Sequence, residues 1–274
     1  MKVHMKSVVY TAGNRAQVVT IEYADVGMGP VIVMLPSLAR SGRDFHAVAP
    51  LVAEQGFRVI LPEPRGIRGS SGPMESLSLH DFSADVAAVL DHEKTGPVVV
   101  VGHAWGSQPA RMLAADRPDL VSAVVMAAAS AGKMLPGSEE KPYSRLRAEI
   151  DGSGDPTLSL DLRLECLRKA FFAPGHDPSI WLDGWSQEAH HAQSYARIHT
   201  PVDDYFSAGD KVPILDLQAR FDAVVIPRIM KVYLSDRVTE EWIEDAGHAL
   251  IPEQPTAFVS AVCRFASSVH GNSH

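Results

Sequence analysis

One histidine and one aspartate of this sequence are placed so that they can form a pair in which the histidine transfers a proton. His248 follows a glycine at the end of the run DAGH at 245–248, and Asp222 ends the run QARFD at 218–222. Each run comes directly after an apolar stretch typical of a buried strand. A carboxylate that binds an imidazole fixes its tautomer and leaves the other ring nitrogen free to take a proton. The sequence therefore predicts an Asp222–His248 pair, with Asp216 and Asp245 as nearby rivals for the acid.

A glycine-flanked turn precedes these residues in the chain. The run GHAWG at 102–106 follows the apolar run VVVV at 98–101 and leads into a helical stretch. Glycines at both ends permit a tight turn from strand to helix, which lifts the middle residue, Ala104, to the tip where a substrate can reach it. Alanine has no group that attacks a carbonyl, so residue 104 cannot form a covalent acyl-enzyme. The simpler alternative is that these glycines merely end a strand.

Short apolar runs alternate with amphipathic stretches on both sides of this turn. A hairpin is expected first, from two strands at 6–10 and 17–23 around Gly13-Asn14. Later strands are predicted at 31–35, 57–61, 98–101, 120–126, 212–218 and 238–243. Helices are predicted from Asp44, from a cap at Ser78, through 112–115 and from Pro255. This alternation is typical of an α/β protein with a parallel sheet and right-handed crossovers.

The alternation stops between residues 132 and 209. This stretch is polar, rich in turns and helical, and it contains Phe171, Phe172, Trp181 and Trp185. We interpret it as a helical cap, residues 132–209, inserted into a core of residues 1–131 and 210–274. A cap over the carboxyl ends of the strands would close an apolar pocket, so at least one of the two tryptophans should face the space above Ala104.

Taken together and in this order, the motifs resemble those of the α/β-hydrolase superfamily over essentially the whole chain. The run LPSL at 35–38 stands at the family's oxyanion loop, and PRGIRGS at 64–70 is similar to its arginine-glycine turn. The family order of nucleophile, acid and histidine falls at Ala104, Asp222 and His248. The resemblance implies a mostly parallel α/β-hydrolase sheet with helices on both faces and an inserted helical cap.

The resemblance also implies the remaining parts of a site. In this family the oxyanion is held by backbone amides, which Leu38 and Trp105 can still supply although Pro36-Ser37 replaces the usual His-Gly. The side chains expected to line the substrate pocket are those of Ser37, His103, Trp181 and Trp185. The alternative for His103 is packing behind the turn, and the alternative for the tryptophans is a place in the small core of the cap itself. The expected substrate is a small organic molecule with a carbonyl group.

Ala104 leaves several functions open. Either an inactivating change has replaced a native serine, or alanine is natural, as in bacterial hydrolase-like sequences with a Gly-His-Ala-aromatic-Gly turn. The first hypothesis is an ester or lactone hydrolase of the Ser-Asp-His type. The alternatives are a lyase, isomerase or cofactor-free oxygenase that uses His248 as a general base, or a non-catalytic protein that binds a ligand in the pocket.

Composition limits the classes of partner and cofactor that the protein is expected to bind. The net charge is −8, from 25 basic and 33 acidic residues, and no basic stripe is present, so neither nucleic acid nor a membrane surface is an expected partner. Cys166 and Cys263 are isolated, and the start lacks the apolar segment of a secretory signal, so a cytoplasmic protein is expected. His190, His191 and His199 lack carboxylate or cysteine partners at a ligand spacing, so no metal or cofactor is predicted. No feature specifies an oligomeric state.

Overall fold

A mostly parallel sheet forms the centre of the protein, which a computed structural model describes at residues 3–13 and 17–271. The strand order is β1-β2-β4-β3-β5-β6-β7-β8; β1–β2 and β2–β4 pair antiparallel, and the remaining neighbours pair parallel. The strands are β1 (His4–Ala12), β2 (Gln17–Gly27), β3 (Val31–Leu35), β4 (Arg58–Pro62), β5 (Val98–His103), β6 (Val121–Ala127), β7 (Ile214–Ala219) and β8 (Val238–Ile243). The predicted α/β class and the amino-terminal hairpin are confirmed, although Asn14 lies outside the described residues.

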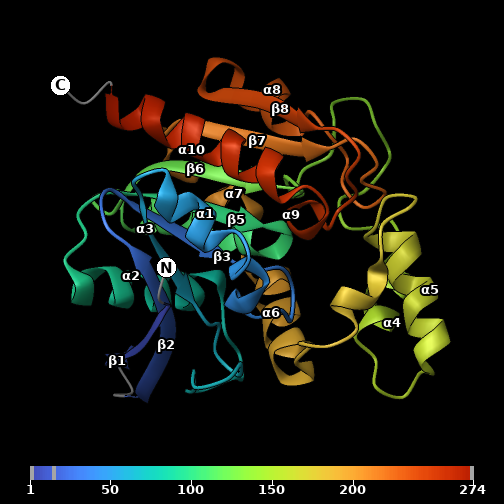
Figure 1. Cartoon of the computed structure of the whole chain (residues 1–274), viewed down its shortest axis with the longest axis horizontal. Coiled ribbons are helices and arrows are strands. Elements are labelled where there is room, and N and C mark those ends of the chain that lie inside the picture. The colour runs from blue at the N-terminus through green and yellow to red at the C-terminus, as the bar shows by residue number, and fades with distance from the viewer. Residues whose placement is uncertain (1–2, 14–16, 272–274) are drawn as a thin grey trace.

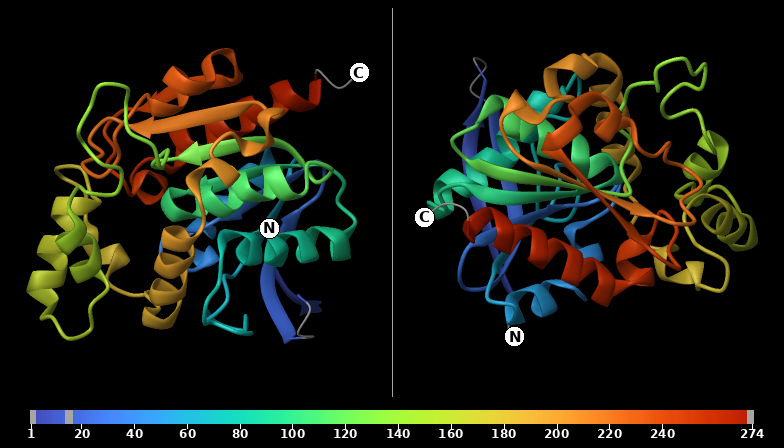
Figure 2. Two further views of the ribbon diagram at one scale, coloured as in Figure 1. Left: turned by 180° about the vertical axis from the view of Figure 1, so that it is seen from behind. Right: turned by 90° about the horizontal axis from the view of Figure 1, so that it is seen from above.

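Helices cover both faces of the sheet (Figure 1, Figure 2). Alternate side chains of a strand point to opposite faces, so Val99 and Val101 of β5 pack with α1 and α10 while Val98 and Val100 pack with α2 and α3. The helices are α1 (Ala49–Glu54), α2 (Leu79–Glu93), α3 (Ser107–Asp116), α4 (Arg147–Ser153), α5 (Leu160–Ala170), α6 (Gln187–His199), α7 (Val202–Tyr205), α8 (Ile229–Leu234), α9 (Leu250–Glu253) and α10 (Pro255–Gly271). Short 3-10 turns are η1 (Gly42–Phe45), η2 (Ala104–Gly106), η3 (Pro178–Trp181), η4 (Ala208–Asp210) and η5 (Ser235–Arg237).

The start of α2 follows the predicted cap. Ser78 precedes the helix, and its backbone N–H donates to Asp81 Oδ2 at 2.8 Å, which forms a reciprocal capping box. Its buried side carries Phe82, Val86 and Leu90 against the sheet and its neighbours. The sequence pattern therefore predicts both the beginning of this helix and the face that it buries.

The chain between β6 and β7 contains the helices that stand apart from the sheet. α4, α5 and α6 lie beyond the carboxyl ends of the strands (Figure 2), whereas α7 and η4 return to pack on α3. An apolar cluster that includes Phe171, Phe172 and Trp181 joins this segment to Ala249, directly after His248. None of the helices described is long and apolar enough to cross a membrane.

Candidate functional site

The strand-to-helix turn holds Ala104 in a strained conformation. Ala104 has a φ of 48°, in the left-handed region that costs an ordinary residue about 1–2 kcal/mol. A Cβ at Gly102 would lie 2.3 Å from Ser107 Cα, and a Cβ at Gly106 would lie 2.4 Å from the Leu35 carbonyl oxygen. Both glycines are therefore required by close backbone approach, and the turn lifts Ala104 to the wall of a pocket.

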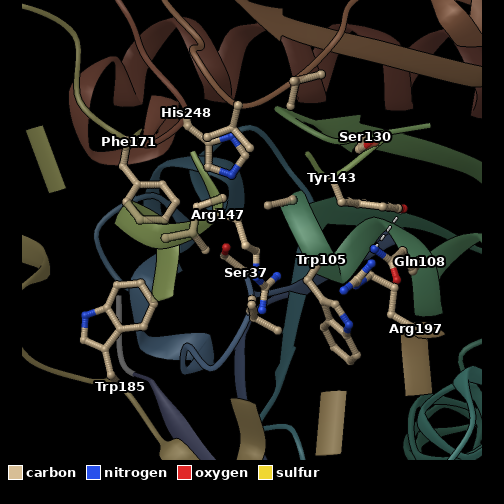
Figure 3. Close-up of a pocket in the computed structure, with 15 residues that line it drawn as sticks. Ser37, Trp105, Gln108, Ser130, Tyr143, Arg147, Phe171, Trp185, Arg197 and His248 are labelled. Atoms are coloured by element: carbon tan, nitrogen blue, oxygen red, sulfur yellow. Dashed lines mark hydrogen bonds between the residues drawn. The ribbon is translucent and has the colours of Figure 1, made fainter. Parts of the chain in front are cut away.

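The predicted acid and histidine lie together. His248 Nδ1 donates to Asp222 Oδ2 at 2.9 Å, with 5% and 3% of the two side chains exposed. The other carboxylate oxygen accepts from the backbone N–H groups of Val224 at 2.8 Å and Val225 at 3.0 Å. Because an ionised carboxylate only accepts, the neutral imidazole carries its proton on Nδ1. Nε2 is left as the acceptor, and Figure 3 shows one ring nitrogen of His248 turned toward the pocket.

The two rival aspartates lie elsewhere. Asp216 is buried in β7, where Oδ1 accepts from Gln218 Nε2. Burial raises the pKa of Asp216 to about 7. Asp245 is exposed, and its carboxylate lies near Gln254 and His176.

His103 supports His248 from behind. Its Nε2 lies 2.8 Å from the His248 carbonyl oxygen, and since a carbonyl accepts, Nε2–H is the donor. Burial lowers the pKa of His103 to about 3, so its ring is neutral. The expectation that His103 lines the substrate pocket is wrong, because the residue is fully buried and holds the loop that carries His248.

The two amides expected to hold an oxyanion lie at the pocket. Leu38 and Trp105 both line it, and within the described residues no acceptor is found for either backbone N–H. Trp105 is in the first turn of a helix, where the N–H groups have no partner inside the helix. Gln193 of α6 forms hydrogen bonds next to both amides. Its Oε1 accepts from the Ala39 N–H at 2.7 Å, and its backbone carbonyl accepts from Trp105 Nε1 at 3.3 Å.

The pocket itself is a cavity of about 80 Å³ with two chemically different walls. In Figure 3, Phe171 and Trp185 lie on one side, and Gln108, Tyr143 and Arg197 lie on the other. The lining residues are Ser37, Leu38, Ala104, Trp105, Gln108, Ser130, Tyr143, Arg147, Ile150, Phe171, Trp185, Arg197, Val224, Val225 and His248.

Only one of the two predicted tryptophans reaches this space. Trp185 lines the pocket, whereas Trp181 is 3% exposed and its ring packs 5.8 Å from that of His103 and 5.5 Å from that of Phe171. The predicted pocket role of Trp181 is therefore wrong, because its ring belongs to the apolar cluster behind the site. The Arg40 guanidinium lies over both indoles, 4.7 Å from the Trp181 ring and 4.9 Å from the Trp185 ring.

Several polar pocket residues were not predicted. Gln108 lies one helical turn after Ala104 on the same face, so its spacing was a usable signal. Gln108 Nε2 donates to Tyr143 Oη at 3.3 Å. Tyr143, Arg147 and Arg197 come from the segment without periodicity, where no motif marks them.

In the described part of the chain, no three potential metal ligands lie close enough to hold an ion.

A mostly parallel sheet whose strand-to-helix elbow faces an Asp–His pair defines the α/β-hydrolase class of fold and site. The chain belongs to this family: residues 30–255 match the alpha/beta hydrolase fold family.

Epoxide hydrolases are among the relatives of this chain. The chain is 35% identical to epoxide hydrolase A of Mycobacterium tuberculosis over 148 residues, which are 51% of this chain and 42% of that protein. It is also 35% identical to the soluble epoxide hydrolase of Corynebacterium sp. (strain C12) over 101 residues, or 37% of this chain and 35% of that protein. The matches thus span less than half the length of these relatives.

Solved structures share the fold over nearly the whole chain. A thermophilic esterase from Thermogutta terrifontis superposes with a TM-score of 0.78 at 20% identity, covering 97% of this chain and 99% of that one. The epoxide hydrolase CorEH superposes with a TM-score of 0.72 at 19% identity, covering 97% of this chain and 100% of that one.

Proposed function

We propose that this protein hydrolyses a small ester or lactone without a covalent intermediate, by using His248 as the base that activates water. The observation that carries the proposal is the bond from His248 Nδ1 to Asp222, which leaves Nε2 as an acceptor at the pocket wall beside Ala104. The chain offers no nucleophile at the elbow, and in this proposal the atom that attacks the carbonyl comes from water. The relatives named as epoxide hydrolases support a hydrolytic reaction.

In the proposed reaction, His248 Nε2 takes a proton from water while the water oxygen bonds to the carbonyl carbon. The carbonyl π electrons move onto oxygen, and the Leu38 and Trp105 amides donate to the resulting oxyanion. Collapse of the tetrahedral intermediate expels the alkoxide, which takes the proton back from His248. A positioned base contributes about 10²–10⁴-fold and an oxyanion donor about 10²–10³-fold in related chemistry.

Ala104 has a defined role in this scheme. Its methyl group leaves room at the tip of the elbow where a serine Oγ would stand, and water can occupy that position. The mechanism therefore uses the same oxyanion amides and the same imidazole as a serine hydrolase, with water in place of the serine.

The test is the origin of the product oxygen. The protein is incubated with small esters and lactones in ¹⁸O-labelled water, and the acid product is analysed by mass spectrometry. Hydrolysis should place one ¹⁸O in each carboxylate formed, and no acyl adduct should appear on the protein. Elimination or isomerisation products without solvent oxygen would contradict hydrolysis and would favour the use of His248 as a base on the substrate itself.

A further inference from the structure

Two arginines line the pocket, and their partners differ. Arg147 is neutralised by Asp151 on the same helix, with Nε 2.9 Å from Oδ2 and Nη2 2.8 Å from Oδ1. Arg197, on α6, forms no ion pair with any carboxylate in the described part of the chain. Its guanidinium lies 4.6 Å from the ring centre of Tyr143. The pocket thus contains one guanidinium that forms no ion pair with a carboxylate of the described residues.

Burial makes this charge costly. Partial burial lowers the pKa of Arg197. Among its neighbours, Arg147 lowers this pKa further, whereas Tyr143, Tyr205 and Asp151 raise it. An arginine nevertheless stays protonated, so an anion that reaches this partly buried guanidinium would stabilise it. Stacking on Tyr143 engages the face of the guanidinium and leaves the N–H donors in its plane free.

The surroundings of Arg197 are suited to hydrogen bonding. Tyr143 Oη and Gln108 Nε2, which are bonded to each other at 3.3 Å, lie beside it on the same wall of the pocket (Figure 3). Phe171 and Trp185 form the opposite wall, and His248 lies between the two walls in the same view. A substrate can therefore present its carbonyl to His248 while a second polar group reaches Arg197.

We propose that Arg197 binds a carboxylate of the substrate, so that the protein selects small carbonyl compounds that carry a carboxylate at one end. The inference rests on the proposed function, because it assumes that the reacting carbonyl lies at His248. One guanidinium without an ion-pair partner matches one carboxylate in charge, and its planar fork matches the two oxygens in geometry. Gln108 Nε2 and Tyr143 Oη are the neutral groups that complete the anion site.

Binding of two nearly isosteric probes tests this without turnover. Succinamate carries one carboxylate and succinamide carries none, and both amides resist hydrolysis during a titration. By isothermal titration or NMR, the parent protein should bind succinamate about 10-fold to 100-fold more tightly, as expected for a hydrogen bond to a charged group of about 1.5–3 kcal/mol. Arg197→Gln should remove this preference, and Arg197→Lys should restore part of it.

The matched control is Arg168→Gln, which removes the same charge from an exposed position on α5 and should leave the preference unchanged. Thermal melts of all variants establish that they are folded. Equal binding of the two probes by the parent, no binding of succinamate, or a preference that survives Arg197→Gln would overturn the anion site. Anion preference without hydrolysis of any ester would overturn the proposed function alone, and hydrolysis without anion preference would overturn the anion site alone.

Discussion

Replacing Asp222 with asparagine should block the base while the fold survives. In Asp222→Asn, the side-chain oxygen can stay toward the N–H groups of Val224 and Val225, which lie 2.8 Å and 3.0 Å from Asp222 Oδ1 in the parent. The amide nitrogen then faces His248 Nδ1 and donates to it, so the imidazole proton moves to Nε2. A protonated Nε2 cannot take a proton from water, and hydrolysis should fall.

The structure also bounds the size of this effect. To return the imidazole proton to His248 Nδ1, the side-chain amide of the variant must rotate so that its oxygen faces the histidine. The N–H groups of Val224 and Val225 then face an NH₂ group, at a cost of about 1–3 kcal/mol each. A total of about 2–6 kcal/mol corresponds to a loss of about 30-fold to 10⁴-fold in rate.

Initial rates with monomethyl succinate measure this loss, and thermal melts check the fold. Asp245→Asn is the matched control, since Asp245 is an exposed acid three residues from His248 and its substitution should leave the rate unchanged. If Asp222→Asn retains the parent rate with an unchanged melting temperature, Asp222 does not orient the base.

Three further substitutions test the elbow, the buried Asp216 and the loop contacts of Glu253. Ala104→Ser should place a nucleophile beside His248, raise ester hydrolysis by at least about 10²-fold and allow labelling by a fluorophosphonate. The reason is that loss of a triad serine costs about 10⁶-fold in a serine hydrolase of unrelated fold but similar chemistry. A folded variant that is not labelled would argue against the elbow geometry. Asp216 has a pKa raised to about 7 by burial, so only the unfolded state loses this proton between about pH 4 and 7, and stability should fall as pH rises through that window. Asp216→Asn should abolish that part of the pH dependence and stabilise the protein at pH 8 by up to about 4 kcal/mol, as measured by urea unfolding; a slope equal to that of the parent would refute it. Glu253 accepts from the Ala173 N–H at 2.6 Å and the Gly247 N–H at 2.7 Å, so Glu253→Ala should lower the free energy of unfolding by about 2–4 kcal/mol, and an unchanged denaturation midpoint would contradict this role.

The parts of the site that depend on strand ends were predictable from the sequence. Asp222 and His248 follow β7 and β8, which are adjacent parallel strands, so their loops meet at one edge of the sheet. The glycines around Ala104 mark a close backbone approach by their spacing alone. For these residues, the local sequence motif and the topology of a parallel sheet predict the same position in the fold.

The parts that depend on irregular backbone were not predictable. Trp181 and Trp185 are four residues apart, but η3 ends at Trp181 and the chain then changes direction, so helical spacing does not say which ring reaches the pocket. In the helix predicted from Asp44, Leu51 shares one helical face with Phe45, Val48 and Val52, so its burial is expected from the spacing. Leu51 is nevertheless 38% exposed, because a 3-10 turn precedes α1 and shifts its phase. Arg197 reaches the pocket only through the packing of α6, which no local pattern records.

With alanine at the elbow, hydrolysis should depend on the imidazole of His248, and the rate of the His248→Gln variant measures that dependence. Initial rates of monomethyl succinate hydrolysis are compared for the parent, with Ala104 in place, and for His248→Gln. We expect measurable turnover by the parent and a loss of about 10²–10⁴-fold in the variant, with succinamate binding retained. Equal rates for the two proteins, or no turnover by the parent on esters and lactones, would contradict it.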